Sequence, residues 1–216
     1  MNELLTTEEG VFLVRLARQA IETYVKEKRV LTLPKTPSKA LQESRGVFVT
    51  IKKRRSSEAS TQELRGCIGR LQPDSDAEAS RISLLEATRE AAISSAVQDP
   101  RFLPVRPNEL DMIQVEVSVL TVPEELVVTD RAKLPQHVTV GKDGLIMELD
   151  AWRRGLLLPQ VAPEQGWNAK QFLEGCCQKA GLSPNSYLDP RVKVYKFQAQ
   201  IFSEMSVRGA IEERHF

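Results

Sequence analysis

The chain has 216 residues, 41% of them hydrophobic, and its 30 basic and 29 acidic residues leave a formal net charge of +1. A chain of this length forms one domain, or two small ones that share a core. The balanced charge argues against a general attraction to nucleic acid or to anionic membranes, and no apolar run approaches the ~20 residues of a membrane span. Three cysteines and an N-terminus without signal-peptide features predict a reduced, cytoplasmic protein.

The first expected element is a helix. Thr6 and Glu9 have the spacing of a capping box, and apolar residues then recur at steps of three and four as far as Val25. A connector that contains proline leads to GVFVTIKKR, residues 46–54, where alternating apolar residues predict a half-buried strand.

The segment KKRRSSEASTQE, residues 52–63, is interpreted as a polar loop between two strands. Its basic part, residues 52–55, offers a phosphate contact, but a solvated hairpin tip is favoured because no aromatic residue is interleaved with the charges. LRGCIGRL, residues 64–71, is predicted to be a second strand paired with the first.

A long helix is predicted over residues 77–97, where apolar residues lie on one side. The next segment, DPRFLPVRPNEL over residues 99–110, has three prolines and no period, which is typical of a connector or a site-forming loop. In MIQVEVSVL, residues 112–120, apolar residues alternate with Gln114, Glu116 and Ser118. This alternation predicts one covered and one solvated sheet face.

Short strands joined by turns are expected from residue 123 to residue 160, including a hairpin over HVTVGKDGLIMEL at 137–149. A helix over 168–180 should begin at the N-cap Asn168 and stop at Gly181. VKVYKFQAQIF, residues 192–202, is predicted to be a single strand. Because strands and helices do not alternate regularly, the expected class is α+β, with a mainly antiparallel sheet packed with helices.

Several kinds of site lack the residues they need. There are two histidines, His137 and His215, and no Cys-x-x-Cys or His-x-x-x-His spacing on which to build a zinc site. No phosphate loop or dinucleotide fingerprint occurs. A Ser-His-Asp triad would have to use His137, which lies in an alternating strand pattern. We therefore expect no metal and no cofactor.

Cys67, in the string LRGCIG, is the main candidate for chemistry. A thiol becomes a good nucleophile when a nearby guanidinium or a cluster of backbone N–H groups lowers its pKa. Gly66 and Gly69 would let backbone amides approach a bound anion, because no Cβ blocks them. In a regular strand Cys67 and Arg65 share a face, which favours Arg65 over Arg70 as the cationic partner. The alternative is a small buried cysteine whose glycines allow a bulge or close packing on a helix.

Asp99 and Arg101, in the string DPRF, are a second candidate pair. Arg101 either presents its guanidinium to a ligand's carboxylate or phosphate, or forms an internal salt bridge with Asp99 that fastens the loop. Gln160, after LLLP, either offers its amide to a ligand or satisfies backbone groups at a strand end. Cys176 and Cys177 lie on an apolar helical face and are expected in the core.

LRGCIG, preceded by GVFVTI and followed by a helix that ends in AAISSAVQDPRF, closely resembles the AMMECR domain family, named for Alport syndrome, midface hypoplasia, intellectual disability and elliptocytosis. The resemblance continues through VEVSVLTVPEEL, GKDGLIMEL, GLLLPQVAPE and FLEGCCQKAGL, in the family's order, over about residues 8–205. It implies one α+β domain over residues 1–216, made of two unequal subdomains with a cleft near LRGCIG. A chain without the long N-terminal extension of the human protein resembles a prokaryotic single-domain member.

The resemblance does not supply a reaction, since the activity of the family is not established. Association of some bacterial and archaeal members with Memo-like and radical-SAM proteins suggests an enzyme or an accessory in a modification pathway. The family's motif residues fall here on residues 64–69, 99–102 and 159–160.

Two functions remain open. In one, Cys67 is the nucleophile of a cysteine-dependent enzyme, with Arg65 and Arg101 as anion contacts and Asp99 as the residue that orients them. In the other, the same surface docks a protein or a small ligand without chemistry, and nucleic acid is not the partner. The candidate ligand-binding residues are Arg65, Gly66, Gly69, Asp99, Arg101 and Gln160.

Overall fold

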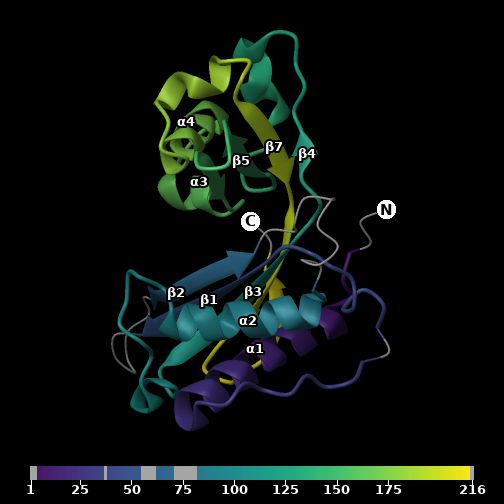
Figure 1. The fold of residues 1–216 in the computed structure, drawn as a ribbon, viewed down its shortest axis with the longest axis vertical. Coiled ribbons are helices and arrows are strands. Elements are labelled where there is room, and N and C mark those ends of the chain that lie inside the picture. The colour runs from purple at the N-terminus through teal and green to yellow at the C-terminus, as the bar shows by residue number, and fades with distance from the viewer. Residues whose placement is uncertain (1–3, 37, 55–61, 71–81, 215–216) are drawn as a thin grey trace. The chain divides into compact units, whose positions relative to one another are not determined.

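The computed structural model describes residues 4–36, 38–54, 62–70 and 82–214 (Figure 1). The chain divides into two compact units. The first runs up to Leu120 and resumes at Gln200, and the second is Thr121–Ala199. Each unit combines an antiparallel sheet with helices, so the predicted α+β class is confirmed.

The first unit contains a five-stranded sheet in the order β2-β1-β3-β8-β9. Two helices contact each other, and both contact this sheet on the same side (Figure 1). β2 is an edge strand of this sheet, so one side of its backbone has no neighbouring strand in the part of the chain that is described. The elements are α1 (Thr7–Glu27), β1 (Val47–Arg54), β2 (Gln62–Arg70), α2 (Leu84–Val97), the 3-10 helix η2 (Pro107–Glu109), β3 (Ile113–Leu120), β8 (Ala199–Glu204) and β9 (Ile211–Arg214).

The predicted N-terminal helix is confirmed as α1, together with its capping box. The Thr6 hydroxyl accepts a hydrogen bond of 3.2 Å from the Glu9 N–H, and the Glu9 carboxylate accepts one of 2.9 Å from the Thr6 N–H. The apolar stripe of α1 is buried, and so are Val47, Val49 and Ile51 of β1. These residues form the core between the helices and the sheet.

The second predicted helix starts later than expected. α2 begins at Leu84, where the Ser83 hydroxyl caps the N–H of Glu86 at 3.2 Å, and Ile82 precedes the helix. Residues 77–81 of that prediction lie outside the described residues, as do residues 55–61 of the predicted polar loop. The strands on either side of that loop extend to Arg54 and from Gln62.

The predicted solvated face of the third strand is wrong. All eight residues of β3 are buried, and Gln114, Glu116 and Ser118 are at most 3% exposed. An alternating pattern indicates that the two faces of a strand differ in polarity, but not that the polar face is exposed to solvent. In β3 both faces are buried. Gln114 donates to the carbonyl of Glu204 at 2.8 Å, and Glu116 accepts from Lys52 at 2.9 Å.

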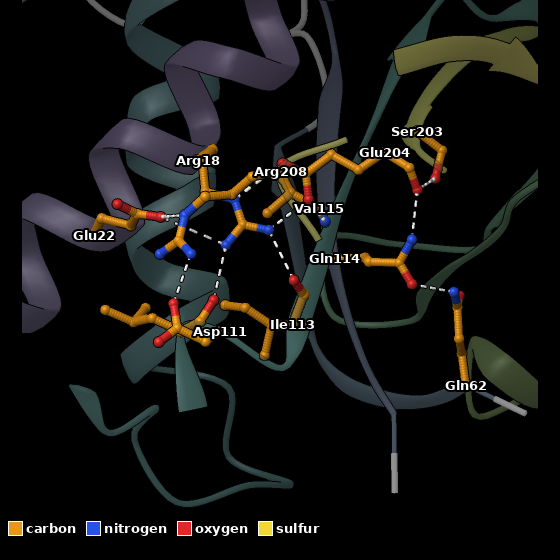
Figure 2. A network of polar contacts seen from close by, with 11 residues as sticks. Arg18, Glu22, Gln62, Asp111, Ile113, Gln114, Val115, Ser203, Glu204 and Arg208 are labelled. Atoms are coloured by element: carbon orange, nitrogen blue, oxygen red, sulfur yellow. Dashed lines mark hydrogen bonds and ion pairs between the residues drawn. The ribbon is translucent and has the colours of Figure 1, made fainter. Parts of the chain in front are cut away.

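A buried ion pair joins α1 to the sheet (Figure 2). The guanidinium of Arg18 binds both carboxylate oxygens of Glu204 on β8 and the carbonyls of Leu110 and Ile113, at 3.2 and 2.8 Å. The same carboxylate accepts the backbone N–H of Val115 at 3.0 Å. One carboxylate therefore connects α1, β3 and β8.

The second unit holds a four-stranded sheet in the order β4-β7-β5-β6. Cys176 and Cys177 are fully buried in its core, beside Phe172 and Leu173, as predicted. The elements are β4 (Glu124–Glu125), the 3-10 helix η3 (Arg131–His137), β5 (Gly144–Glu148), β6 (Arg154–Leu157), α3 (Val161–Gln165), α4 (Ala169–Lys179), the 3-10 helix η4 (Pro184–Leu188) and β7 (Lys193–Phe197).

The helix predicted over 168–180 is confirmed as α4, with Asn168 as its N-cap and a left-handed Gly181 just after its end. The hairpin predicted over 137–149 is wrong. His137 ends η3 instead of lying in a strand, and β5 pairs with β6 and β7. The preceding residues form a turn in which Asp143 accepts the N–H of Thr139 at 2.9 Å.

The predicted last strand is two strands in different sheets. β7 and β8 are separated at Gln198, whose N–H donates to the Thr121 hydroxyl at 2.9 Å and whose carbonyl accepts the Thr121 N–H at 2.8 Å. Alternation therefore does not continue from Phe197 to Ile201. The short elements β9 and α3 were not predicted.

A membrane-crossing helix is absent from the part of the chain that the structure describes, since none of its helices is both long enough and apolar enough.

Candidate functional site

Cys67 lies on β2 and points away from the helices. Gly66 pairs with Ile51, and a Cβ built on Gly66 would overlap the carbonyl oxygen of Ser95 on α2, so Gly66 faces the helices. Since neighbouring residues alternate, Cys67 faces the opposite side, together with its cross-strand partner Thr50. We call this side of the β2-β1-β3 part of the sheet the Cys67 face.

A β-bulge occurs directly before Gly66. Ile51 pairs with Gly66 while Lys52 pairs with Leu64, which leaves Arg65 as the extra residue of β2. The shared face predicted for Arg65 and Cys67 required a regular strand, and β2 is not regular at this point. Arg65 instead donates from Nε and Nη2 to the two carboxylate oxygens of Glu109, each at 3.0 Å.

The thiol of Cys67 is partly buried and accepts a hydrogen bond of 3.3 Å from the Thr50 hydroxyl. Burial raises the pKa of the Cys67 thiol, because the charged form loses solvation. The Thr50 hydrogen bond and the positive charge of Arg101 act in the opposite direction without overcoming the effect of burial. The thiol is therefore protonated near neutral pH.

Asp99 and Arg101 hold the backbone of Cys67 from the open edge of β2. Asp99, 4% exposed, accepts the Cys67 N–H at 2.9 Å, and Arg101 Nη2 donates to the Cys67 carbonyl at 3.2 Å. The two side chains also form a bidentate pair, Nε to Oδ1 at 2.9 Å and Nη2 to Oδ2 at 2.7 Å. They bind the backbone N–H and C=O of Cys67 as a neighbouring strand would. The hydrogen bonds from Arg101 hold the pKa of Asp99 well below its usual range.

Ser95 connects α2 to the two strands on the other side of the sheet. Its hydroxyl donates to the Val49 carbonyl at 2.7 Å and accepts the Ile68 N–H at 2.8 Å. Gly66 allows this close approach of helix and strand. On the Cys67 face, a Cβ on Gly69 would overlap the ring of Phe48. Both candidate glycines therefore have a packing role in the fold.

The two candidate arginines lie against the ring of Phe102, with guanidinium carbons 5.9 Å (Arg65) and 5.5 Å (Arg101) from its centroid. Each is paired with a carboxylate, Arg65 with Glu109 and Arg101 with Asp99. Hydrogen bonds lower the pKa of Glu109 to about 2, and the one from Arg65 has the largest effect. Nη1 of Arg65 is buried and has no hydrogen-bond partner in the described part of the chain.

Gln160 belongs to the second unit. It is 8% exposed, precedes α3 without capping it by a side-chain hydrogen bond, and its Oε1 has no partner among the described residues. Burial raises the pKa of Cys177 to about 11 and that of Cys176 further. Within the described ranges, His, Cys, Asp and Glu side chains do not gather in a group of three or more that could hold a metal ion.

Four residues that contact the LRGCIG strand or its neighbours were not predicted: Thr50, Ser95, Glu109 and Glu116. Thr50 and Glu116 had a signal, because each alternates with apolar residues and so lies opposite the core side of its strand. Their alignment with Cys67 depends on strand register, which the sequence alone does not give. Ser95 had no signal, since a serine among alanines is unremarkable in a helix.

Three comparisons place the chain among known proteins. The family model AMMECR1 matches residues 14–202. A protein from Thermofilum pendens is 46% identical over 97% of this chain and 96% of its own length, and one from Methanothermobacter thermautotrophicus is 50% identical over 93% and 96%. The crystal structure of an uncharacterized protein from Pyrococcus horikoshii has 46% identity and a TM-score of 0.88, and the match covers 98% of this chain and 99% of that one.

These matches confirm the resemblance predicted from LRGCIG and the strings that follow it. The family model covers most of the chain, and the archaeal relatives match over nearly their whole length. The chain belongs to the AMMECR1 family.

Proposed function

We propose that the Cys67 face and the adjoining β2 edge form a binding site in which Cys67 is a neutral contact residue and not a nucleophile. The observation that carries this proposal is the partly buried position of the thiol, which accepts a hydrogen bond from the Thr50 hydroxyl. Burial raises the pKa of Cys67, whereas a cysteine nucleophile needs a lowered one. Asp99 and Glu116 act in the same direction as burial, since a negative charge nearby disfavours a thiolate.

The surroundings of the thiol support the same conclusion. A cysteine nucleophile is usually activated by a histidine, and the described residues of the first unit include none. The two nearby arginines are bound to Glu109 and Asp99, which neutralise much of their charge. A binding role needs neither a base nor an unpaired cation.

Alkylation with iodoacetamide across a range of pH tests this proposal. Peptide mapping by mass spectrometry reads Cys67 separately from the two buried cysteines, and the denatured chain is the control. We expect Cys67 to react more slowly than in the denatured chain near neutral pH, with an apparent pKa above the ~8.5 of a free cysteine. Faster reaction with a lower apparent pKa would reject the binding role.

The second candidate is a cysteine-dependent enzyme that uses the same site. Two observations favour it: the Thr50 hydroxyl donates to Cys67 Sγ, and Arg101 lies close enough for its charge to lower the thiol pKa. In such an enzyme, Arg101→Ala should raise the thiol pKa further and slow alkylation. If Arg101 acts only on the backbone carbonyl of Cys67, the labelling profile should barely change.

We further propose that the partner is a small molecule or a protein, with Memo-like and radical-SAM proteins among the candidates. The proposed location is cytoplasmic, and we expect no binding to nucleic acid. All three cysteines are free, which suits a reducing compartment. Lys52 and Lys53, from the basic segment, are bound to Glu116 and Glu109 at 2.9 and 2.8 Å and offer little charge to phosphates. Saturable binding of a single-stranded oligonucleotide at low salt would contradict the proposal that the protein does not bind nucleic acid.

We also propose that the two units fold as the single domain predicted over residues 1–216. The first unit is discontinuous in sequence, because the second is inserted between Leu120 and Gln200. The chain therefore passes between the units twice. Thermal unfolding followed by circular dichroism and by calorimetry should show one shared transition, and two separate transitions would contradict a single domain.

A further inference from the structure

Buried polar side chains continue the Cys67 face across β1 and β3. The strand registers align Cys67 with Thr50 and Thr50 with Glu116, and Ser118 follows two residues further on β3, on the same side. Thr50, Glu116 and Ser118 are at most 6% exposed. Together with Lys52, which lies two residues after Thr50 on β1, these side chains form a polar row. Cys67 and Lys52 are partly exposed, so the row leads from the surface into the interior.

Among the described residues, the polar groups of this row have room for further hydrogen bonds. The Ser118 hydroxyl is fully buried and has no hydrogen-bond partner in the described part of the chain. The Glu116 carboxylate makes one hydrogen bond there, from Lys52 Nζ to Oε2. Cys67 Sγ accepts from Thr50, which leaves the thiol proton free to be donated. Buried polar groups are paired in nearly all proteins. A hydroxyl without a partner in the described residues, on the same strand face as a carboxylate with one hydrogen bond, points to a ligand that binds both.

The charges of the row restrict the kind of ligand. Lys52 balances Glu116, and a protonated thiol adds no charge. An anion would be repelled by the buried Glu116 carboxylate, and a cation by the ammonium of Lys52. A neutral group that both donates and accepts suits this pair, because its N–H can approach Glu116 while its oxygen accepts from Lys52 or Ser118.

From this arrangement we infer that the Cys67 face binds a neutral ligand through an amide group. The inference rests on the proposed binding role and names the chemistry of its ligand. It differs from anion binding by Arg65 and Arg101, because both guanidinium groups are already paired with carboxylates. The amide belongs either to a carboxamide, as in a small molecule or a glutamine side chain, or to a peptide backbone.

Titration of the full-length ¹⁵N-labelled protein with small probes, followed by NMR, tests the inference. The probes are acetamide for a carboxamide, N-methylacetamide for a peptide unit, and acetate and inorganic phosphate for anions. We expect one of the two amides to shift the resonances of Cys67, Glu116 and Ser118 in a saturable way, and the tighter amide identifies the source. Equal or tighter binding of acetate or phosphate at these residues would overturn the inference, as would the absence of any amide response.

Ser118→Ala provides the specific variant, and Thr88→Val is its matched control. Thr88 also has a buried hydroxyl without a partner in the described residues, but it lies on α2, away from the Cys67 face. Loss of one hydrogen bond should weaken amide binding about threefold to tenfold in Ser118→Ala and leave it unchanged in Thr88→Val. Equal affinity in both variants would contradict the placement of the amide beside Ser118.

The two proposals fail in different ways. A lowered thiol pKa in the alkylation experiment rejects the neutral binding role, whatever the probes do. A raised thiol pKa together with preferential anion binding keeps the binding role and rejects the amide ligand.

Discussion

Asp99 Oδ2 accepts a hydrogen bond of 2.9 Å from the backbone N–H of Cys67, 32 residues earlier in the chain. This bond fixes the DPRF segment to the open edge of β2. Arg101 binds the carbonyl of the same residue, so both the N–H and the C=O of Cys67 are hydrogen-bonded at this edge. An edge strand covered in this way is less available for unwanted pairing with other strands. Asp99 and Arg101 thus bind the backbone of the LRGCIG motif on both sides of Cys67.

Asp99→Asn should destabilise the protein by about 2 kcal/mol at neutral pH. The change removes the charge that strengthens the bonds from Cys67 and Arg101, and the loss is moderated because the Arg101 side chain is half exposed. Urea denaturation at neutral pH measures the effect. Asp111→Asn is the control, because Asp111 is an exposed aspartate paired with Arg208, and it should change stability little.

The Asp99 effect should depend on pH in a defined direction. Since the folded-state pKa of Asp99 lies below its unfolded value of ~3.9, ionised Asp99 stabilises the fold fully above that value. The contribution is lost as the pH falls through the folded-state pKa. The stability difference between wild type and Asp99→Asn should stay constant above about pH 5 and shrink at lower pH. A difference that grew on acidification would exclude this linkage.

Local patterns predicted the elements whose signals lie close together in the chain. The capping box of Thr6 and Glu9, the alternation from Val47 to Ile51 and the N-cap Asn168 each depend on residues within a few positions. The later start of α2 had a local signal that was missed, because Ser83 and Glu86 have the same spacing as Thr6 and Glu9. The division of the last strand at Gln198 had no comparable signal, since it depends on hydrogen bonds with the distant Thr121.

The sequence patterns singled out some of the residues around Cys67 and missed others. Cys67, Asp99 and Arg101 were singled out, and the structure brings these three together. Arg65 was also singled out, but the bulge in β2 turns it to Glu109. Bulges and strand register arise from pairing between distant segments, which a single sequence does not specify.

Ser95→Ala should destabilise the protein by about 1–3 kcal/mol, because it leaves the partly buried Ile68 N–H and the buried Val49 carbonyl without the hydroxyl that joins them. Ser94→Ala is a matched control at the next position of α2. Among the described residues, the Ser94 hydroxyl bonds only to the exposed Gln98, so its removal should cost much less. Thermal denaturation of both variants provides the comparison. Equal losses would mean that the hydroxyl of Ser95 does not join the two strands.

Gly66→Ala should destabilise the protein by about 1–3 kcal/mol, because the added Cβ meets backbone atoms of α2 that cannot move alone. Gly46→Ala is the control, since the nearest atoms to its Cβ lie at 3.2–3.3 Å and include the flexible side chain of Leu120. Urea midpoints of the two variants measure the difference. A larger loss at Gly46 would contradict the close packing of β2 against α2.

Ser118→Ala should keep or raise stability, by up to about 1 kcal/mol, because its buried hydroxyl makes no hydrogen bond to any described residue. Removal of a buried hydroxyl usually destabilises a protein. No loss is expected at Ser118, because we propose that its hydroxyl is paired only when the ligand is bound. Calorimetry of the ligand-free variant measures it. A loss above about 1 kcal/mol would show that the hydroxyl is already bonded in the free protein.

The buried pair of Arg18 and Glu204 should be costly to break from one side. Arg18→Met leaves the Glu204 carboxylate buried without its counter-charge and should cost about 3–5 kcal/mol. Glu204→Gln should cost less, because the Arg18 guanidinium keeps the Glu22 carboxylate and two backbone carbonyls as partners. The glutamine also keeps an oxygen for the Val115 N–H. In the double variant neither charge remains, so we expect it to be more stable than the sum of the two single losses predicts. Urea denaturation of the four proteins gives the coupling energy, and additive losses would show that the two charges do not stabilise each other.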